Sequence, residues 1–216
     1  MEVALIITVF FSIAGLVIFI AWFYDKKRSE DLKAIANSLN FSFERKGDEF
    51  LISMNDDFEL FSHGRSKKIY NVMNGRSGDM DITIMDYQYT VGGGKNSSTH
   101  AQTIIMVQSN QLELPPFTLT PETVFHKIGS VFGYQDIDFA SHPKFSKQYL
   151  LRGDDEEYIK ETFKEELLDF YEKDKTLNTE AEYDKFVYYK ANKKLAPKEI
   201  HGFLQESIDL YGLLKT

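Results

Sequence analysis

The chain has 216 residues, of which 43% are hydrophobic and 27% are charged, and its formal net charge at pH 7 is −8. This composition indicates one globular domain, or one domain with a short appendage, and excludes a wholly disordered chain. Because the chain contains no cysteine, a disulfide framework, a zinc-thiolate or iron–sulfur site and a thiol nucleophile are excluded.

An uncharged apolar run extends from Val3 to Phe23. At about 1.5 Å per residue, a helix of this length covers roughly 31 Å, which is close to the hydrocarbon thickness of a bilayer. Aromatic residues close the run and basic residues follow it, as is typical of a helix end at the membrane–water interface. Six residues are predicted to lie at this interface: Trp22, Phe23, Tyr24, Lys26, Lys27 and Arg28.

The flanking charges predict how this segment crosses the membrane. Only Met1 and the acidic Glu2 precede the apolar run, whereas a basic triplet follows it. The positive-inside rule therefore predicts a single-pass protein of the inner (plasma) membrane, with its N-terminus outside and its C-terminal domain in the cytoplasm. A cleavable signal peptide is disfavoured, because such peptides have a basic front end and an apolar stretch of about 7–15 residues.

The remainder of the chain is acidic. Residues 29–216 carry 22 basic and 31 acidic side chains, a net charge of −9. This balance disfavours nucleic acid as a partner and predicts a body that hangs from the membrane without lying flat on it. The basic triplet alone is too small a cluster for a lipid-binding patch. We expect the membrane and an unidentified protein as partners, and the small-residue stripe of Ala4, Thr8, Ser12 and Gly15 permits a homodimer through the anchor.

Hydrophobic periodicity predicts an anchor with a basic flank at residues 1–28 and a single globular domain at residues 29–216. The expected elements, in chain order, are a helix at 30–39, short strands at 41–43 and 50–52, a helical turn at 58–61, an antiparallel meander of strands at 68–73, 79–91 and 99–108, a helix from Pro121, a short strand at 149–151, a helix after Asp154, a strand at 186–189 and a closing amphipathic helix from Pro197. Strands come mostly first and helices later, so the predicted fold class is α+β, with a transmembrane helix before the domain.

The central strand of the meander switches its apolar face. Ile82 and Ile84 share one side, whereas Met85, Tyr87 and other apolar residues share the opposite side. Either a bulge or a strand covered on both faces explains the switch. In both cases Asp86 falls in line with Ile82 and Ile84, so we expect it to be partly buried.

No catalytic residue or cofactor is identified by a motif. The Gly92–Lys95 segment lacks the spacing of a phosphate-binding loop, and no Gly-x-Ser-x-Gly pattern occurs. One low-specificity set of residues is a candidate ligand or metal cluster: Asp86, His100, Asp136, Asp138 and His142. The competing interpretations are a structural hydrogen bond for Asp86 and a polar loop with capping aspartates at residues 136–142.

Several segments together resemble a bacterial family of single-pass membrane-anchored proteins of unknown function. They are Ile69–Gly75, Met85–Thr90, Gly94-Lys95, Asp136–Phe139 and Phe145-Ser146. The resemblance implies a bacterial inner-membrane protein and assigns no role to any residue.

The predicted anchor and the absence of catalytic spacing together favour a non-catalytic interaction or scaffolding module. The alternatives are a metal-dependent hydrolase and a small-ligand sensor that use the Asp/His set.

Overall fold

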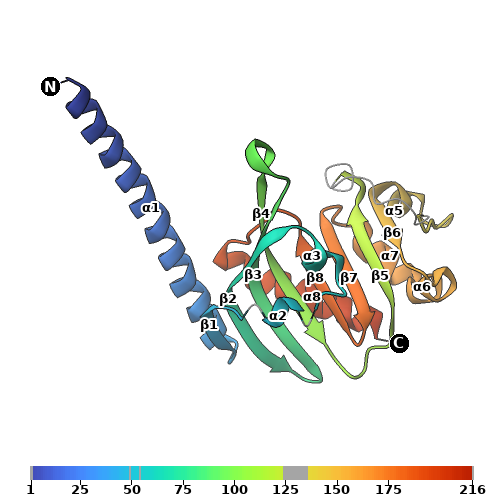
Figure 1. Cartoon of the computed structure of the whole chain (residues 1–216). Coiled ribbons are helices and arrows are strands. Elements are labelled where there is room, and N and C mark those ends of the chain that lie inside the picture. The colour runs from blue at the N-terminus through green and yellow to red at the C-terminus, as the bar shows by residue number, and fades with distance from the viewer. Residues whose placement is uncertain (1, 49, 54, 124–135, 216) are drawn as a thin grey trace.

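A computed structural model describes residues 2–48, 50–53, 55–123 and 136–215 (Figure 1). The helices are α1 (Glu2–Ser38), α2 (Phe50–Ser53), α3 (Glu59–Ser62), α5 (Pro143–Gln148), α6 (Glu156–Thr162), α7 (Glu165–Glu172) and α8 (Ile200–Leu214), with short 3-10 turns η1 (Gly94–Asn96) and η2 (Pro197–Glu199). The strands are β1 (Ser42–Lys46), β2 (Arg65–Ser77), β3 (Met80–Val91), β4 (Ser98–Gln108), β5 (Leu114–Pro121), β6 (Tyr149–Arg152), β7 (Leu177–Tyr183) and β8 (Lys185–Lys190).

These strands form one eight-stranded antiparallel sheet in the order β1-β2-β3-β4-β8-β7-β5-β6. The predicted α+β class, the β2–β3–β4 meander and the closing helix α8 are confirmed. The predicted strand at 50–52 is wrong, because these residues lie in the one-turn helix α2.

The helix predicted from Pro121 begins one residue later, because Glu122 and Thr123 are helical but Pro121 is not. Pro121 is the last residue of β5 and pairs with Tyr149 of β6, and residues 124–135 of the predicted helix lie outside the described residues. Two further prolines, Pro115 and Pro116, fall at a register shift between Leu114 and Phe117, where the ladder is interrupted. A missing N–H is tolerated at such a position, so a proline-rich segment can form an inner strand.

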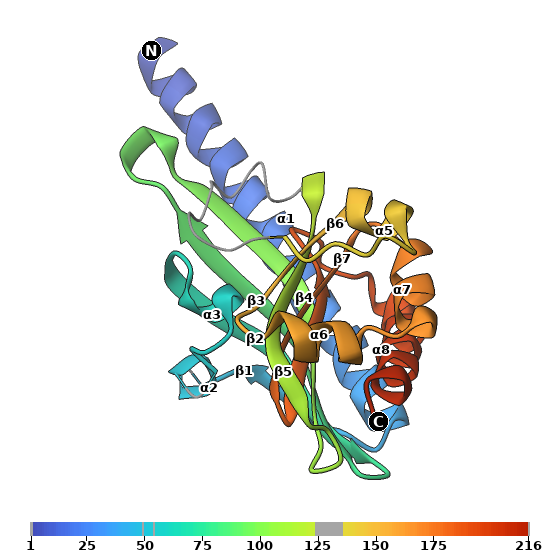
Figure 2. The same ribbon diagram turned by 90° about the vertical axis from the view of Figure 1, so that its right-hand side faces the viewer.

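The sheet buries apolar side chains on both faces. Figure 2 shows α2 and α3 on one side of it and α7 and α8 on the other. Ile82 and Ile84 of β3 belong to the core under α1 and α5–α8, whereas Met85, Tyr87 and Tyr89 belong to the core under α2 and α3. The face switch in β3 therefore reflects a strand that is covered on both sides. A bulge lies in the neighbouring β2, between Tyr70 and Met73.

Helix α1 passes without a break from the apolar run into the domain, and it includes the predicted helix at 30–39. Its N-terminal half projects away from the body (Figure 1), and Phe10 and Ile18 there are 68% and 70% exposed. Its C-terminal turns pack on the domain, where Leu32 and Ala36 are buried. A single long apolar helix at the N-terminus, among the described residues, indicates membrane anchoring.

Candidate functional site

A buried polar cluster connects α1 to the sheet. Arg28 of α1 donates two hydrogen bonds to Asp86 of β3, from Nε to Oδ2 and from Nη2 to Oδ1, both at 2.8 Å. Asp86 is only 2% exposed. The pair is bidentate, the strongest geometry for a guanidinium with a carboxylate.

Neighbouring groups complete the coordination of this ion pair. Thr103 Oγ1 and Asn71 Nδ2 each donate to Asp86 at 2.9 Å, and Arg28 Nη1 donates to the Leu195 carbonyl at 2.6 Å. Ser29 Oγ donates to Asn71 Oδ1 at 2.7 Å. The turn of α1 that carries Arg28 and Ser29 is thus fixed to β2, β3, β4 and the segment after β8. We call this set the helix clamp: Arg28, Ser29, Asn71, Asp86, Thr103 and Leu195.

The local backbone explains why Asn71 takes this place. It lies in the β2 bulge with a positive φ of 52°, a conformation that asparagine adopts more readily than most residues. The bulge turns its side chain toward Asp86.

Electrostatics in the clamp favour the charged carboxylate. Burial raises the pKa of Asp86, but the hydrogen bonds and charge of Arg28, the charge of Lys194 and the Asn71 amide outweigh it, so the pKa lies below its ordinary value. Asp86 is therefore an ionised, fully coordinated group. This geometry favours the structural hydrogen-bond role over a general base.

The other residues of the predicted Asp/His set lie in different surroundings. His100 of β4 stacks on Tyr89 at 5.2 Å between ring centroids, and its Nδ1 bonds to Asn192. Asp136 Oδ1 accepts from the Leu151 amide at 3.1 Å, and His142 Nε2 lies 3.7 Å from Asp169. Burial, with a contribution from the neighbouring charge of Asp138, raises the pKa of Asp136 to about 6.

The sheet keeps most of these residues apart. Asp86 and His100 lie on the adjacent strands β3 and β4, whereas Asp136 lies beside β6, which is five strands from β3. At about 4.8 Å per strand, that separation is roughly 24 Å. Within the described ranges, no three Asp, Glu or His side chains are grouped as a metal ion would require. The structure brings Asp136 near Asp138 and leaves Asp86 in the helix clamp.

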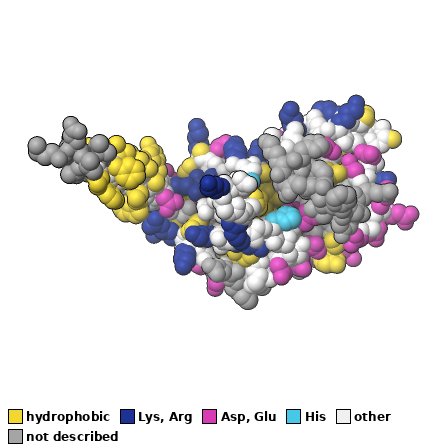
Figure 3. Space-filling view, turned by 45° about the horizontal axis from the view of Figure 1, so that its top comes forward, with side chains coloured by type: hydrophobic (Ala, Val, Ile, Leu, Met, Phe, Trp, Pro, Cys, Tyr) yellow, Lys and Arg dark blue, Asp and Glu magenta, His cyan; other side chains and the backbone are white. Residues whose placement is uncertain are grey.

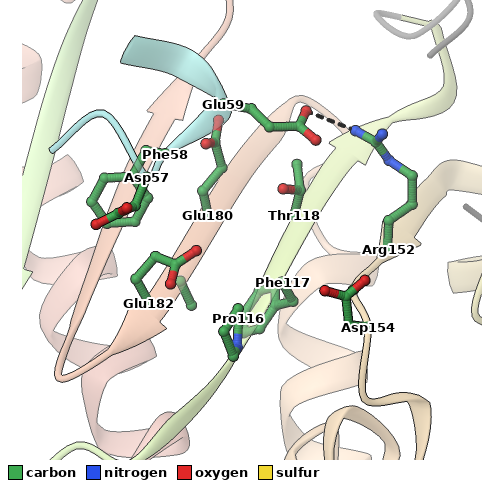
Figure 4. Close-up of a pocket in the computed structure, with 12 residues that line it drawn as sticks. Asp57, Phe58, Glu59, Pro116, Phe117, Thr118, Arg152, Asp154, Glu180 and Glu182 are labelled. Atoms are coloured by element: carbon green, nitrogen blue, oxygen red, sulfur yellow. Dashed lines mark hydrogen bonds and ion pairs between the residues drawn. The ribbon is translucent and has the colours of Figure 1, made fainter. Parts of the chain in front are cut away.

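A small cleft of about 210 Å³ lies between α3, β5, β7 and the turn after β6 (Figure 4). Its charged lining is mainly acidic and consists of Asp57, Glu59, Asp154, Glu180, Glu182 and Arg152. Arg152 Nη2 donates to Glu59 Oε2 at 2.9 Å, which ties α3 to β6. No pattern in the sequence predicted this cleft, because its residues come from four separate segments.

Glu180 is the most unusual member of this lining. It is 3% exposed, and its carboxylate accepts from the Leu60 amide at 3.1 Å and from the Tyr189 hydroxyl at 2.8 Å. Burial raises its pKa to about 7 in spite of these donors, which lower it. Glu180 therefore exchanges its proton near neutral pH.

Comparisons with known proteins identify a fold. No family model matches this chain, and no curated protein sequence matches it. The chain is similar to the crystal structure of the mycobacterial trehalose monomycolate transport factor A, TtfA, with a TM-score of 0.59 over 87% of this chain and 96% of that one. The two sequences are 11% identical, so the likeness shows that the two proteins share a fold and carries no residue role from one to the other.

Proposed function

We propose that this protein is a non-catalytic interaction or scaffolding module, held at the cytoplasmic face of a bacterial inner membrane by α1. The division into an anchor at residues 1–28 and a domain at residues 29–216 belongs to this proposal, although α1 crosses the boundary. The observation that carries it is the helix clamp. A flexible tether would suffice to keep an enzyme near a membrane, whereas this helix enters the core and is fixed by a buried ion pair.

The rigid attachment gives the domain a constant orientation to its anchor. Leu32 and Ala36 pack in the core, and Arg28 is held on both oxygens of Asp86. An interaction surface on the domain is then presented at a fixed height and angle, which lowers the ordering cost of assembly with another membrane protein. The fold that the chain shares with a transport factor is compatible with a partner in a membrane transport assembly.

Topology is tested with reporters fused after Thr216. A fluorescent protein that matures only in the cytoplasm should be bright, and a phosphatase that is active only outside the inner membrane should be inactive. The opposite pattern would contradict the predicted orientation.

Partner binding is tested by capturing the full-length protein through a C-terminal tag in a mild detergent. The matched control keeps the domain and replaces the apolar run with an unrelated transmembrane sequence. A partner of the domain should be recovered with both chains, whereas a partner of the anchor should be lost from the control. Failure to recover any specific protein with either chain, across several detergents, would count against a scaffolding role.

A further inference from the structure

The end of the sheet that carries the β3–β4 hairpin lies on the same side as the membrane segment. Phe41, just after α1, packs at Gly75, which pairs with Ile82, whereas Arg28 contacts Asp86 farther along β3. The direction from the C-terminus to the N-terminus of α1 is therefore the direction in which β3 runs toward the hairpin tip. Figure 1 shows both the N-terminal half of α1 and the hairpin projecting from the same side of the body.

The lengths of the two elements place the tip at membrane height. The apolar run ends at Phe23, five residues before Arg28, which is roughly 8 Å along a helix. Gly92 lies six residues beyond Asp86, which is roughly 20 Å along a strand. Because Arg28 and Asp86 are in contact, the hairpin extends as far as the helix–membrane interface, even where the two elements diverge.

Basic side chains gather at this end of the body. They come from α1, β1, β2, the hairpin tip and the segment after β8, and all except the half-buried Lys67 are exposed: Lys26, Lys27, Lys46, Arg65, Lys67, Lys68, Lys95, Lys193 and Lys194. Figure 3 shows Lys and Arg side chains around the foot of α1 and others at the far edge of the body, where most of the visible Asp and Glu side chains also lie. We call this set of nine residues the basic end.

Carboxylates near the basic end are largely neutralised by basic partners. Asp25 pairs with Arg45, Glu30 with Lys26, and Glu199 with Lys193. Carboxylates also gather at the opposite end of the sheet, where the strand turns carry Glu113, Glu182, Asp184 and Asp81, the last of which pairs with Arg76. The net charge of −9 on residues 29–216 therefore conceals an uneven distribution, in which basic side chains gather at one end.

We propose that the basic end binds the anionic headgroups of the membrane that α1 spans. This inference rests on the proposed anchoring, and it differs from the expectation that the acidic body hangs from the membrane without lying flat on it. The basic triplet at 26–28 is too small for lipid recognition, but folding adds distant lysines to it and reaches the cluster size that anionic membranes attract. Anionic lipid is the favoured occupant because the anchor holds the basic end beside the headgroups at high effective concentration.

The polarity of the hairpin tip suits the headgroup layer. Residues 92–98 are three glycines followed by Lys95, Asn96 and two serines, and none of them has an apolar side chain. Contact with lipid phosphates would stabilise such a tip, whereas entry into the hydrocarbon layer would cost free energy.

The protein is well suited to a direct test, since it has no cysteine and its one tryptophan, Trp22, reports on the anchor. The full-length chain is reconstituted into vesicles of phosphatidylcholine alone, or with about one-third phosphatidylglycerol. A fluorophore is placed at the hairpin tip through Ser97→Cys, or at the opposite end through Ser77→Cys. Headgroup-spin-labelled lipid quenches a fluorophore that lies at the membrane surface, and brominated acyl chains quench an inserted Trp22.

In the mixed vesicles, the fluorophore at position 97 should be quenched strongly and the fluorophore at position 77 should not. Quenching at position 97 should fall in phosphatidylcholine alone and at high salt, where the Debye length shrinks to about 3 Å at 1 M. Lys68→Gln with Lys95→Gln should lower the ratio of docked to undocked domain roughly 30-fold. The matched change Lys160→Gln with Lys164→Gln, on exposed residues of α6 and the turn after it, should leave the ratio unaltered.

Trp22 separates failure of this inference from failure of the anchoring. If Trp22 is quenched while position 97 is quenched no more than position 77, the anchor stands and the docked basic end is refuted. Equal quenching of position 97 with and without phosphatidylglycerol would show that tether geometry alone brings the tip to the surface, which also refutes headgroup recognition. An unquenched Trp22 would refute the proposed anchoring itself.

Discussion

Asp86 and Glu180 are two buried carboxylates on opposite faces of one sheet, and their surroundings give them opposite acid–base behaviour. Asp86 meets the Arg28 guanidinium and two neutral donors, whereas Glu180 accepts from backbone amides of α3 and from a tyrosine hydroxyl. Burial raises the pKa of both groups, yet the pKa of Asp86 lies below its ordinary value and that of Glu180 is raised to about 7.

The comparison shows that burial alone does not decide the charge of a carboxylate. Neutral donors offset part of the desolvation cost, but a cation in bidentate contact is needed to reverse the shift. The ionised carboxylate stands where a separate helix must be fixed, and the protonatable one stands in the wall of a cleft. Four substitutions test how far this contrast holds.

The largest effect is expected from Arg28→Met, which leaves Asp86 buried without its main counter-ion. Removing one partner of a buried ion pair lowers the free energy of unfolding by about 3–5 kcal/mol. We expect a loss near the lower figure, because Lys194 lies 3.6 Å from Asp86 and still partly compensates its charge. Urea unfolding of the full-length chain in detergent, followed by the near-ultraviolet circular dichroism of its tyrosines, gives the free energy. A loss below about 1 kcal/mol would show that Asp86 does not depend on Arg28 for its charge.

The double change Arg28→Met with Asp86→Leu should recover part of that loss, because no uncompensated charge remains. Recovery is incomplete, since the Asn71 amide and the Leu195 carbonyl lose their partners. With Asp86→Leu alone completing the cycle, we expect a coupling energy of about 2–3 kcal/mol. Additive single losses would mean that the two residues act independently.

Glu180→Gln tests the other carboxylate through pH. The unfolded carboxyl ionises near 4.5 and the folded one near 7, so the folded state binds more protons between these values. Stability should therefore fall as pH rises from 4.5 through about 7, by on the order of 1–3 kcal/mol, and remain lower above it.

Glutamine at position 180 should remove this dependence and make the protein more stable than the parent at pH 8. Thermal unfolding at a series of pH values measures the effect, with Glu161→Gln on the exposed face of α6 as the control. A pH slope between 4.5 and 7 that survives Glu180→Gln unchanged would assign it to other groups.

The smallest effect is expected from Lys194→Gln. Its ammonium lies 3.6 Å from Asp86 and its side chain is 37% exposed, so solvent screens the interaction. A loss of less than about 1 kcal/mol is expected in the same urea experiment. A loss as large as that of Arg28→Met would make Lys194 the main counter-ion of Asp86.

Predictions from the sequence succeeded where the signal is local. The apolar run from Val3 to Phe23 and the turns between β2, β3 and β4 are carried by consecutive residues. The expected burial of Asp86 also holds, since alternation along a strand fixes its face once Ile82 and Ile84 are known to be inside.

Predictions failed or were missing where neighbours in space override local preference. Strand β7, for which no element was predicted, carries the polar residues Asn178, Thr179 and Glu180, yet all three are buried between β8 and β5. The Asp/His set was joined by residue type alone, and the sheet order places its members at β3, β4 and the β6 side. No pattern in a single sequence specifies strand order, because the register of distant strands depends on packing.

The sequence by itself determined an apolar N-terminal helix, an α+β domain with a three-stranded meander and an acidic average charge, since each follows from composition or short-range periodicity. Only the tertiary structure decided that Arg28 meets Asp86 across 58 residues, that Glu180 lies beneath α3, and that lysines from five segments share one end with the anchor. These are contacts between residues far apart in the chain, and they form only once the sheet brings their strands together.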